Sequence, residues 1–130
     1  MYTKEEQNAV NEIKTILENY EKFQGKVSYL IEDSERKILF CNKSFCNMIG
    51  FDGEPENLIG YNCEKAAEDN KSLYINSEKF VEDINDIFKD KTKKQTHLIE
   101  MVNGKKYKRD YVPLFFQDNY IGHSWQYYEI

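Results

Sequence analysis

The chain has 130 residues, which is the length of one ordinary domain with no room for a second core. It holds 10 Tyr, 8 Phe and 1 Trp against three alanines, which excludes an Ala-rich helical bundle. The formal net charge of −5 argues against nonspecific binding to nucleic acid, so we expect no nucleic-acid partner.

Targeting and redox features of the sequence favour the cytoplasm. No apolar run approaches the roughly 20 residues that a membrane span needs, and the polar start of the chain has no signal-peptide core. We therefore expect no membrane contact by this segment. Cys41, Cys46 and Cys63 make an odd number of cysteines without a C-x-x-C pair, which predicts reduced thiols in a cytoplasmic protein.

The first predicted element is a helix that ends near Gly25. Thr3 and Glu6 form the pattern of a capping box at its start. Four apolar residues then recur at 3-4-3 spacing along an otherwise charged helix: Val10, Ile13, Leu17 and Tyr20. This seam fits two alternatives, packing onto the helix's own domain or pairing with a second copy in a homodimer. We expect residues 1–24 to form a flanking helix and 25–130 to form the domain.

The period of the pattern changes after this helix. Residues 27–31 and 38–41 are rich in β-branched and aromatic residues and flank a polar turn, which predicts a β-hairpin. A short helix over 42–49 follows, closed by Gly50. Residues 51–76 are irregular, with two brief helical patterns. An irregular stretch of this length inside a compact domain is typical of a segment that lines a ligand site.

The clearest helix of the chain is predicted over 77–89, with Asn76 or Ser77 as its N-cap. Its apolar residues share one face: Phe80, Val81, Ile84, Ile87 and Phe88. Three strands are predicted after it, over 96–102, 105–116 and 120–128. Asn103-Gly104 predicts a two-residue turn between the first two of them. The order of elements predicts an α+β fold in which helices cover one face of an antiparallel sheet.

The chain resembles the PAS domain family from about Val27 to Ile130, roughly four-fifths of its length, and four segments carry the resemblance. The segments are Ile38-Leu-Phe-Cys-Asn42 with Phe45 and Ile49-Gly-Phe51, Glu56-Asn-Leu-Ile-Gly60, Asn103-Gly104 through Tyr111-Val-Pro-Leu114, and Gly122-His-Ser-Trp125 through Ile130. The last two are most like PAS domains of bacterial sensor histidine kinases. Glu129 stands where the family usually has aspartate, and no threonine follows, so we expect a domain excised from a longer protein.

The resemblance implies a five-stranded antiparallel sheet whose inner face and short helices enclose a cavity. The residues that it implies as cavity lining are Phe45, Ile49, Leu58, Cys63, Leu73, Phe80, Ile84, Tyr111 and Trp125. Two alternatives remain open. The large side chains either fill the cavity, or they frame space for a small-molecule ligand.

The cofactor is left unknown, because the sequence argues against flavin and haem. Asn62-Cys63 is similar to the start of the flavin-binding motif in blue-light-sensing PAS domains, but Glu64 follows where a flavin phosphate needs a cation. The helix over 77–89 holds no histidine that could bind haem, and both histidines lie on predicted strands. The pair Cys41-x₄-Cys46 lacks the second close pair of a zinc site, so we expect no metal.

The sequence contains none of the GxGxxG, GxxxxGK[ST], HExxH or GxSxG motifs, so we expect no catalytic residues. The basic runs at 89–94 and 105–109 fit protection of strand edges, with an anionic ligand or partner as the alternative. The resemblance implies a sensory and dimerisation module that acts on a downstream output domain of the same chain. The alternatives are a receptor for a small molecule or cofactor and a stand-alone protein interaction domain.

Overall fold

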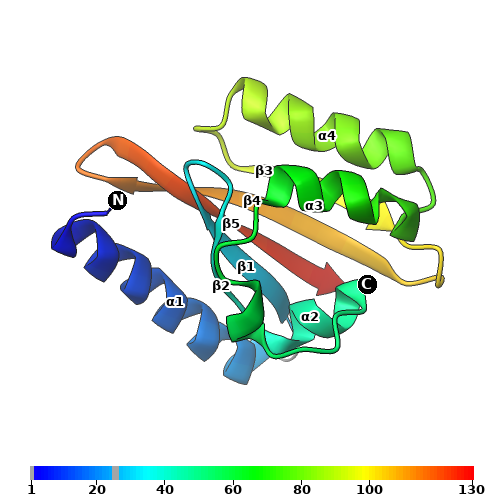
Figure 1. Cartoon of the computed structure of the whole chain (residues 1–130), viewed down its shortest axis with the longest axis horizontal. Coiled ribbons are helices and arrows are strands. Elements are labelled where there is room, and N and C mark those ends of the chain that lie inside the picture. The colour runs from blue at the N-terminus through cyan, green and yellow to red at the C-terminus, as the bar shows by residue number, and fades with distance from the viewer. Residues whose placement is uncertain (1, 25–26) are drawn as a thin grey trace.

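A computed structural model of the chain describes the backbone of residues 2–24 and 27–130 and the side chains of residues 2–19 and 27–130. Its centre is one five-stranded sheet, and the predicted α+β fold is confirmed (Figure 1). The strands are β1 (Val27–Asp33), β2 (Ile38–Cys41), β3 (Gln95–Glu100), β4 (Lys106–Phe116) and β5 (Asn119–Glu129). Their order in the sheet is β2-β1-β5-β4-β3, and every neighbouring pair is antiparallel.

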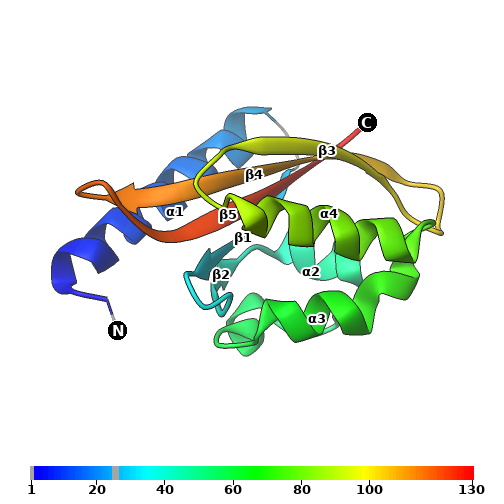
Figure 2. The same cartoon turned by 90° about the horizontal axis from the view of Figure 1, so that it is seen from above.

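Helices cover both faces of this sheet, and each face has its own apolar core. Figure 2 shows α1 (Lys4–Gln24) on one side and the other helices on the opposite side. These others are α2 (Lys43–Ile49), the 3₁₀ helix η1 (Pro55–Leu58), α3 (Cys63–Asn70), the 3₁₀ helix η2 (Lys71–Leu73) and α4 (Ser77–Lys89). We call the side of α2 to α4 the inner face and the side of α1 the outer face. Among the described residues, none is buried in both cores.

Side-chain caps fix where the helices begin. Thr3 and Glu6 form the predicted capping box, in which each side chain accepts a hydrogen bond from the other residue's backbone N–H. The side chain of Asn42 accepts from Phe45 N at 3.0 Å and starts α2. Asn76 is the N-cap of α4, which agrees with the first of the two predicted cap positions, Asn76 and Ser77.

The predicted hairpin between β3 and β4 is confirmed, but its connection is not the predicted two-residue turn at Asn103-Gly104. The N–H of Gly104 donates to the carbonyl of Met101, so the reversal begins at Met101, and Gly104 follows it with φ of +89°. Val102 donates to the carbonyl of Leu73, which ties this segment to η2 and displaces the turn along the chain. The two-residue turn of the sheet lies instead between β4 and β5, where Gln117 and Asp118 both have positive φ.

Candidate functional site

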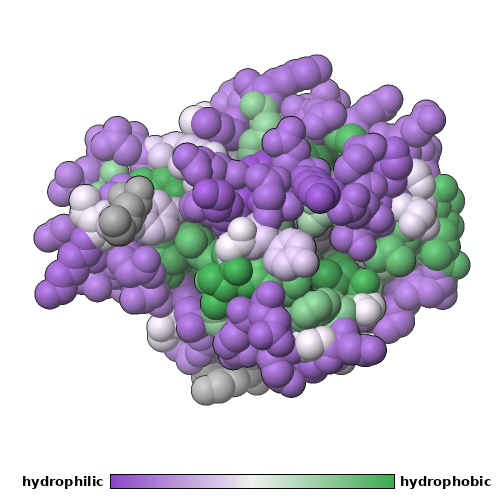
Figure 3. All heavy atoms as spheres, viewed as in Figure 1, coloured by the Kyte–Doolittle hydropathy of each residue, from purple (hydrophilic) through white to green (hydrophobic). Residues whose placement is uncertain are grey.

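A cavity of about 480 Å³ lies between the inner face of the sheet and the short helices. Apolar and aromatic side chains make most of its wall: Leu30, Ile38, Phe45, Ile49, Phe51, Leu58, Tyr61, Ala66, Ala67, Tyr74, Phe80, Ile84, Trp125 and Tyr127. Figure 3 shows apolar side chains gathered on the side of η1 and α2, below the hydrophilic surface of α3 and α4. Ile59 and Tyr61, which follow η1 in the chain, are more than half exposed. The volume and the lining are those of a small-molecule pocket.

Seven of the nine residues predicted to line the cavity do so: Phe45, Ile49, Leu58, Cys63, Phe80, Ile84 and Trp125. Leu73 and Tyr111 lie outside the lining. Leu73 is half-buried in η2 and packs against the inner core. The ring of Tyr111 is covered by Phe88, and its hydroxyl donates to the carbonyl of Lys91 at 2.7 Å. The last turn of α4 therefore separates Tyr111 from the cavity.

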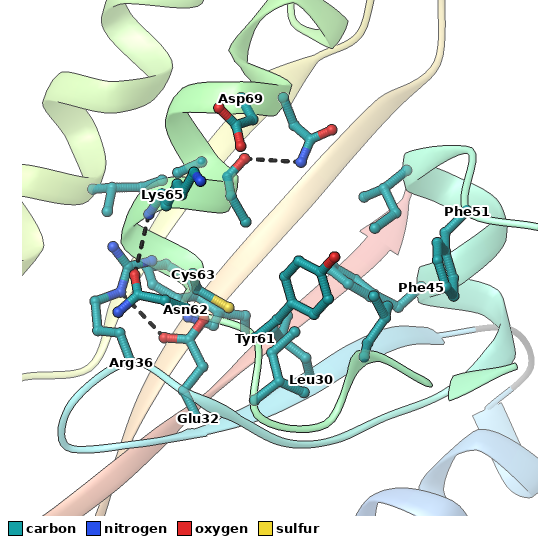
Figure 4. Close-up of a pocket in the computed structure, with 18 of the residues that line it drawn as sticks. Leu30, Glu32, Arg36, Phe45, Phe51, Tyr61, Asn62, Cys63, Lys65 and Asp69 are labelled. Atoms are coloured by element: carbon teal, nitrogen blue, oxygen red, sulfur yellow. Dashed lines mark hydrogen bonds and ion pairs between the residues drawn. The ribbon is translucent and has the colours of Figure 1, made fainter. Parts of the chain in front are cut away.

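Polar residues outside the predicted lining also contribute to the cavity wall, and Glu32, Arg36 and Asn62 lie together at one end of it (Figure 4). Glu32 is wholly buried, and its carboxylate lies 3.3 Å from Nε of Arg36. Asn62 caps α3 by accepting from the N–H of Lys65 at 3.2 Å. Asp69 comes from the same helix and also lines the cavity. The sequence alone does not show that such charged residues line a cavity, because charged residues are equally common on turns and helix faces that only contact solvent.

Glu32 belongs to a buried network that reaches the surface at Tyr120. Nε2 of His123 hydrogen-bonds to the Glu32 carboxylate, and the Tyr120 hydroxyl lies 2.5 Å from Nδ1 of His123. Burial raises the pKa of Glu32, but the hydrogen bond and charge of His123, together with Arg36, outweigh it and hold the pKa below its ordinary value. The carboxylate is therefore ionised at neutral pH, and Nε2 of His123 is the donor to it.

Cys63 is a buried free thiol beside this carboxylate. Burial raises its pKa, and the negative charge of Glu32 raises it further, so the thiol stays protonated at neutral pH. A protonated, buried thiol is a poor nucleophile. In the part of the chain that the structure describes, no group of three or more His, Cys, Asp or Glu is arranged to hold a metal ion.

Arg109 does not lie at the surface, although the sequence places it in a basic run at a predicted strand start. Its side chain is wholly buried on the inner face of β4. The ring of Trp125 lies 5.1 Å from the guanidinium carbon, and the ring of Phe80 lies 5.5 Å from it. Both rings line the cavity.

The apolar seam of α1 faces the outer side of the chain's own sheet. Val10 and Leu17 are buried there against β1, β4 and β5, and Ile13 packs against the same core. The side chain of Tyr20 is outside the described residues. Ile16 points away from this core and is 62% exposed. The homodimer through this seam stays a prediction.

Comparisons with known proteins identify the fold. The sequence model of a family described as "PAS domain" matches residues 26–117. No curated protein matches the sequence. Among described residues, none of the helices is both long and apolar enough to cross a membrane.

Solved structures with similar folds come from different kinds of protein. A PAS domain from Colwellia psychrerythraea has a TM-score of 0.57 at 14% identity, over 91% of this chain and 96% of that one. A sensory box sensor histidine kinase from Vibrio cholerae has a TM-score of 0.56 at 14% identity, over 95% and 97%. The PAS domain of the fruit-fly ELK potassium channel has a TM-score of 0.58 at 14% identity, over 91% and 96%. At this identity the likeness shows the fold alone.

Proposed function

Because this chain belongs to the PAS domain family, we propose that it is the sensory and dimerisation module of a multidomain signal-transduction protein. We further propose that the parent is a bacterial two-component sensor histidine kinase in the cytoplasm. The PAS fold is a sensory fold, and the parent's catalytic step then belongs to a downstream output domain of the same chain.

One observation carries this proposal: a single layer of sheet separates the cavity from α1. On β1, Leu30 and Glu32 face the cavity, whereas Tyr29 and Ile31 belong to the core under α1. A rearrangement at the inner face therefore reaches α1 through one strand. A signal needs only to bind one arrangement of the sheet and helix more tightly than another in order to shift their populations.

The cavity supports a second candidate function, that of a receptor for a small molecule. About 480 Å³ is inside the range of ligand pockets, and the lining combines apolar walls with a few polar groups at one end. In this second candidate function, binding of the ligand is the event that changes the arrangement of the sheet and α1. Flavin and haem remain disfavoured by the residues that follow Cys63 and by the positions of the histidines.

Solution mass tests the dimerisation part of the proposal. Because Val10 and Leu17 are buried on the chain's own sheet, a dimer in which α1 stays docked must use another face of the helix. Ile16 is a large apolar residue exposed on such a face. We expect light scattering to give a dimer for the whole chain and a monomer for I16D, with the melting temperature of the monomeric variant retained. Exposed E18Q is the matched control and stays dimeric. A monomeric wild-type chain at every concentration contradicts dimerisation.

Amide hydrogen exchange tests the relay. A compound that binds the cavity should change the exchange rates of α1, although none of the described side chains of α1 lines the cavity. Binding that leaves the exchange of α1 unchanged contradicts transmission through the sheet. The β4–β5 turn, at Gln117 and Asp118, serves as the internal reference. It does not line the cavity, so its exchange rates should stay unchanged when the compound binds.

A further inference from the structure

Arg109 carries a buried charge for which the described residues supply no carboxylate partner. Its side chain is wholly buried, and in the described part of the chain Nε, Nη1 and Nη2 all lack a partner at strict hydrogen-bond geometry. A guanidinium stays protonated in proteins. Burying an ionised group is costly unless it is paired, so an orphaned buried guanidinium marks a place where an anion belongs.

Carboxylates on the elements around Arg109 have other partners. Asp110, the next residue of β4, accepts from Thr96 Oγ1 at 2.7 Å. Asp83 of α4 lies 2.9 Å from Nζ of Lys79. Glu32 pairs with His123 and Arg36. Arg109 takes part in none of the ion pairs among the described residues, so its counter-charge has to come from outside them.

The guanidinium lies directly behind the wall of the cavity. The rings of Phe80 and Trp125 lie over it at 5.5 Å and 5.1 Å. Burial raises the pKa values of Tyr74 and Tyr127, and the charge of Arg109 opposes this rise at both. At Tyr127 it is helped by a hydrogen bond from Arg109 to the neutral hydroxyl, which supplies no counter-charge. All four of these residues line the cavity. Aromatic faces attract a cation but do not satisfy the N–H groups that lie in its plane. One layer of rings therefore separates five donors from the cavity.

We propose that the cavity binds an amphipathic organic anion, a monocarboxylate with an apolar body, whose carboxylate pairs with Arg109. The inference rests on the receptor function proposed above and names its ligand class. The charges that line the cavity sum to zero, because Arg36 and Lys65 are positive and Glu32 and Asp69 are negative. Arg109, which lies behind the lining, therefore adds one unpaired positive charge to this region.

Carboxylate is the group that fits this donor set. Its two oxygens match the fork of the guanidinium in a bidentate pair, and the apolar wall accommodates the rest of the molecule. The carboxylate reaches Arg109 by rotation of the Phe80 side chain. Phe80 stacks on Tyr74 at 3.7 Å and is carried by α4, so occupancy of the cavity is coupled to the position of that helix.

A matched pair of probes tests this ligand class on the whole chain. Calorimetric titrations at pH 7 use 4-phenylbutanoate and its neutral amide, 4-phenylbutanamide, which have the same apolar body. We expect the wild-type chain to bind the acid about tenfold to a hundredfold more tightly than the amide, because a charge-assisted pair replaces an orphaned cation.

Two variants locate the source of the preference. R109Q should bind acid and amide equally, and its retained amide binding reports that the cavity is folded. K108Q, which removes an exposed positive charge from the neighbouring position of β4 and does not touch the cavity lining, should keep the preference. Equal binding of acid and amide by the wild-type chain overturns the assignment of Arg109 but leaves the receptor function standing. Binding of neither compound by the wild-type chain overturns both. The wild-type comparison decides the question even if R109Q does not fold.

Discussion

Glu32 on β1 and His123 on β5 are paired directly on these two neighbouring strands. Their wholly buried side chains share a hydrogen bond. Arg36 holds the same carboxylate from the β1–β2 turn, where it adopts φ of 64°. A non-glycine residue with positive φ is strained, and the contact with Glu32 and the ring of Phe88, 4.8 Å away, helps to hold it there. The polar end of the cavity is thus fixed by a small buried ion network.

The Glu32–His123 pair should give the protein an acid-sensitive stability. The pKa of Glu32 is lower in the folded state, so its stabilisation is fully present above the unfolded pKa near 4.5 and is lost as the pH falls through the folded pKa. At pH 7, E32Q should lower the free energy of unfolding by about 3–5 kcal/mol, because His123 and Arg36 lose their buried partner. Urea denaturation between pH 7 and pH 3 measures both effects.

E35Q is the matched control for this experiment. Glu35 lies in the same β1–β2 turn with its side chain 74% exposed, and its ion pair with Lys37 is a surface pair. We expect E35Q to change the free energy of unfolding by less than about 0.5 kcal/mol at pH 7. The prediction fails if the two variants lose similar stability, or if E32Q shows the same acid dependence as the wild-type chain.

Asn42 is predicted to be the most sensitive cap of the fold. Its side chain accepts from the N–H groups of Phe45 and Tyr29 and donates to the carbonyl of Val27 at 2.7 Å, all in buried surroundings. N42A should lower the free energy of unfolding by about 3 kcal/mol, since it leaves buried backbone groups unpaired. N62A, which removes the exposed cap of α3, should cost about 1 kcal/mol. Denaturant titrations of the two variants should reproduce this order.

Local patterns in the sequence predicted the elements and the fold well. The spacing of Phe80, Ile84 and Ile87 predicted the face of α4 that packs on the sheet, and the Thr3–Glu6 pattern predicted the start of α1. Such features depend on neighbours three or four residues away. The turn at Asn103-Gly104 was mispredicted because the contact that displaces it is a long-range bond, from Val102 to Leu73.

Long-range relationships also explain which parts of the site escaped prediction. Glu32 and His123 are 91 residues apart, and β1 is buried on both faces, so no alternation of polar and apolar residues marks Glu32 as inward. Arg109 follows three lysines within a few residues and looks like part of a solvated run. Only the register of β4 with β5, which pairs Arg109 with Tyr127, places it on the inner face.

Gly122 should tolerate no side chain, because β5 passes too close to β1 at this point. A Cβ there would lie 2.3 Å from the backbone oxygen of Glu32 and 3.2 Å from Cα of Asp33. Backbone atoms cannot rotate away, so G122A must push the strands apart beside the Glu32–His123 pair. We expect it to lower the free energy of unfolding by about 3 kcal/mol and to flatten the acid dependence described above.

G104A is the matched control for the glycine experiment. Gly104 has φ of +89°, but nothing lies within 4 Å of an added Cβ. The substitution should therefore cost only the backbone strain, about 1–2 kcal/mol, and leave the acid dependence unchanged. A G122A chain that keeps the full acid dependence would contradict the proposed link between strand separation and the buried pair.

Leu17 distinguishes the two alternatives for the seam of α1. Its side chain is buried in the core formed with β1, β4 and β5, so L17A should lower the free energy of unfolding by about 2–3 kcal/mol. Because the contact is within one chain, the loss should be the same in chemical denaturation at low and high micromolar protein concentration. I16A, on the exposed side of the same helix turn, should leave the stability of the monomer unchanged. A loss at L17A that grows with protein concentration would instead mean that this seam is shared with a second copy, and that α1 leaves its own sheet to form it.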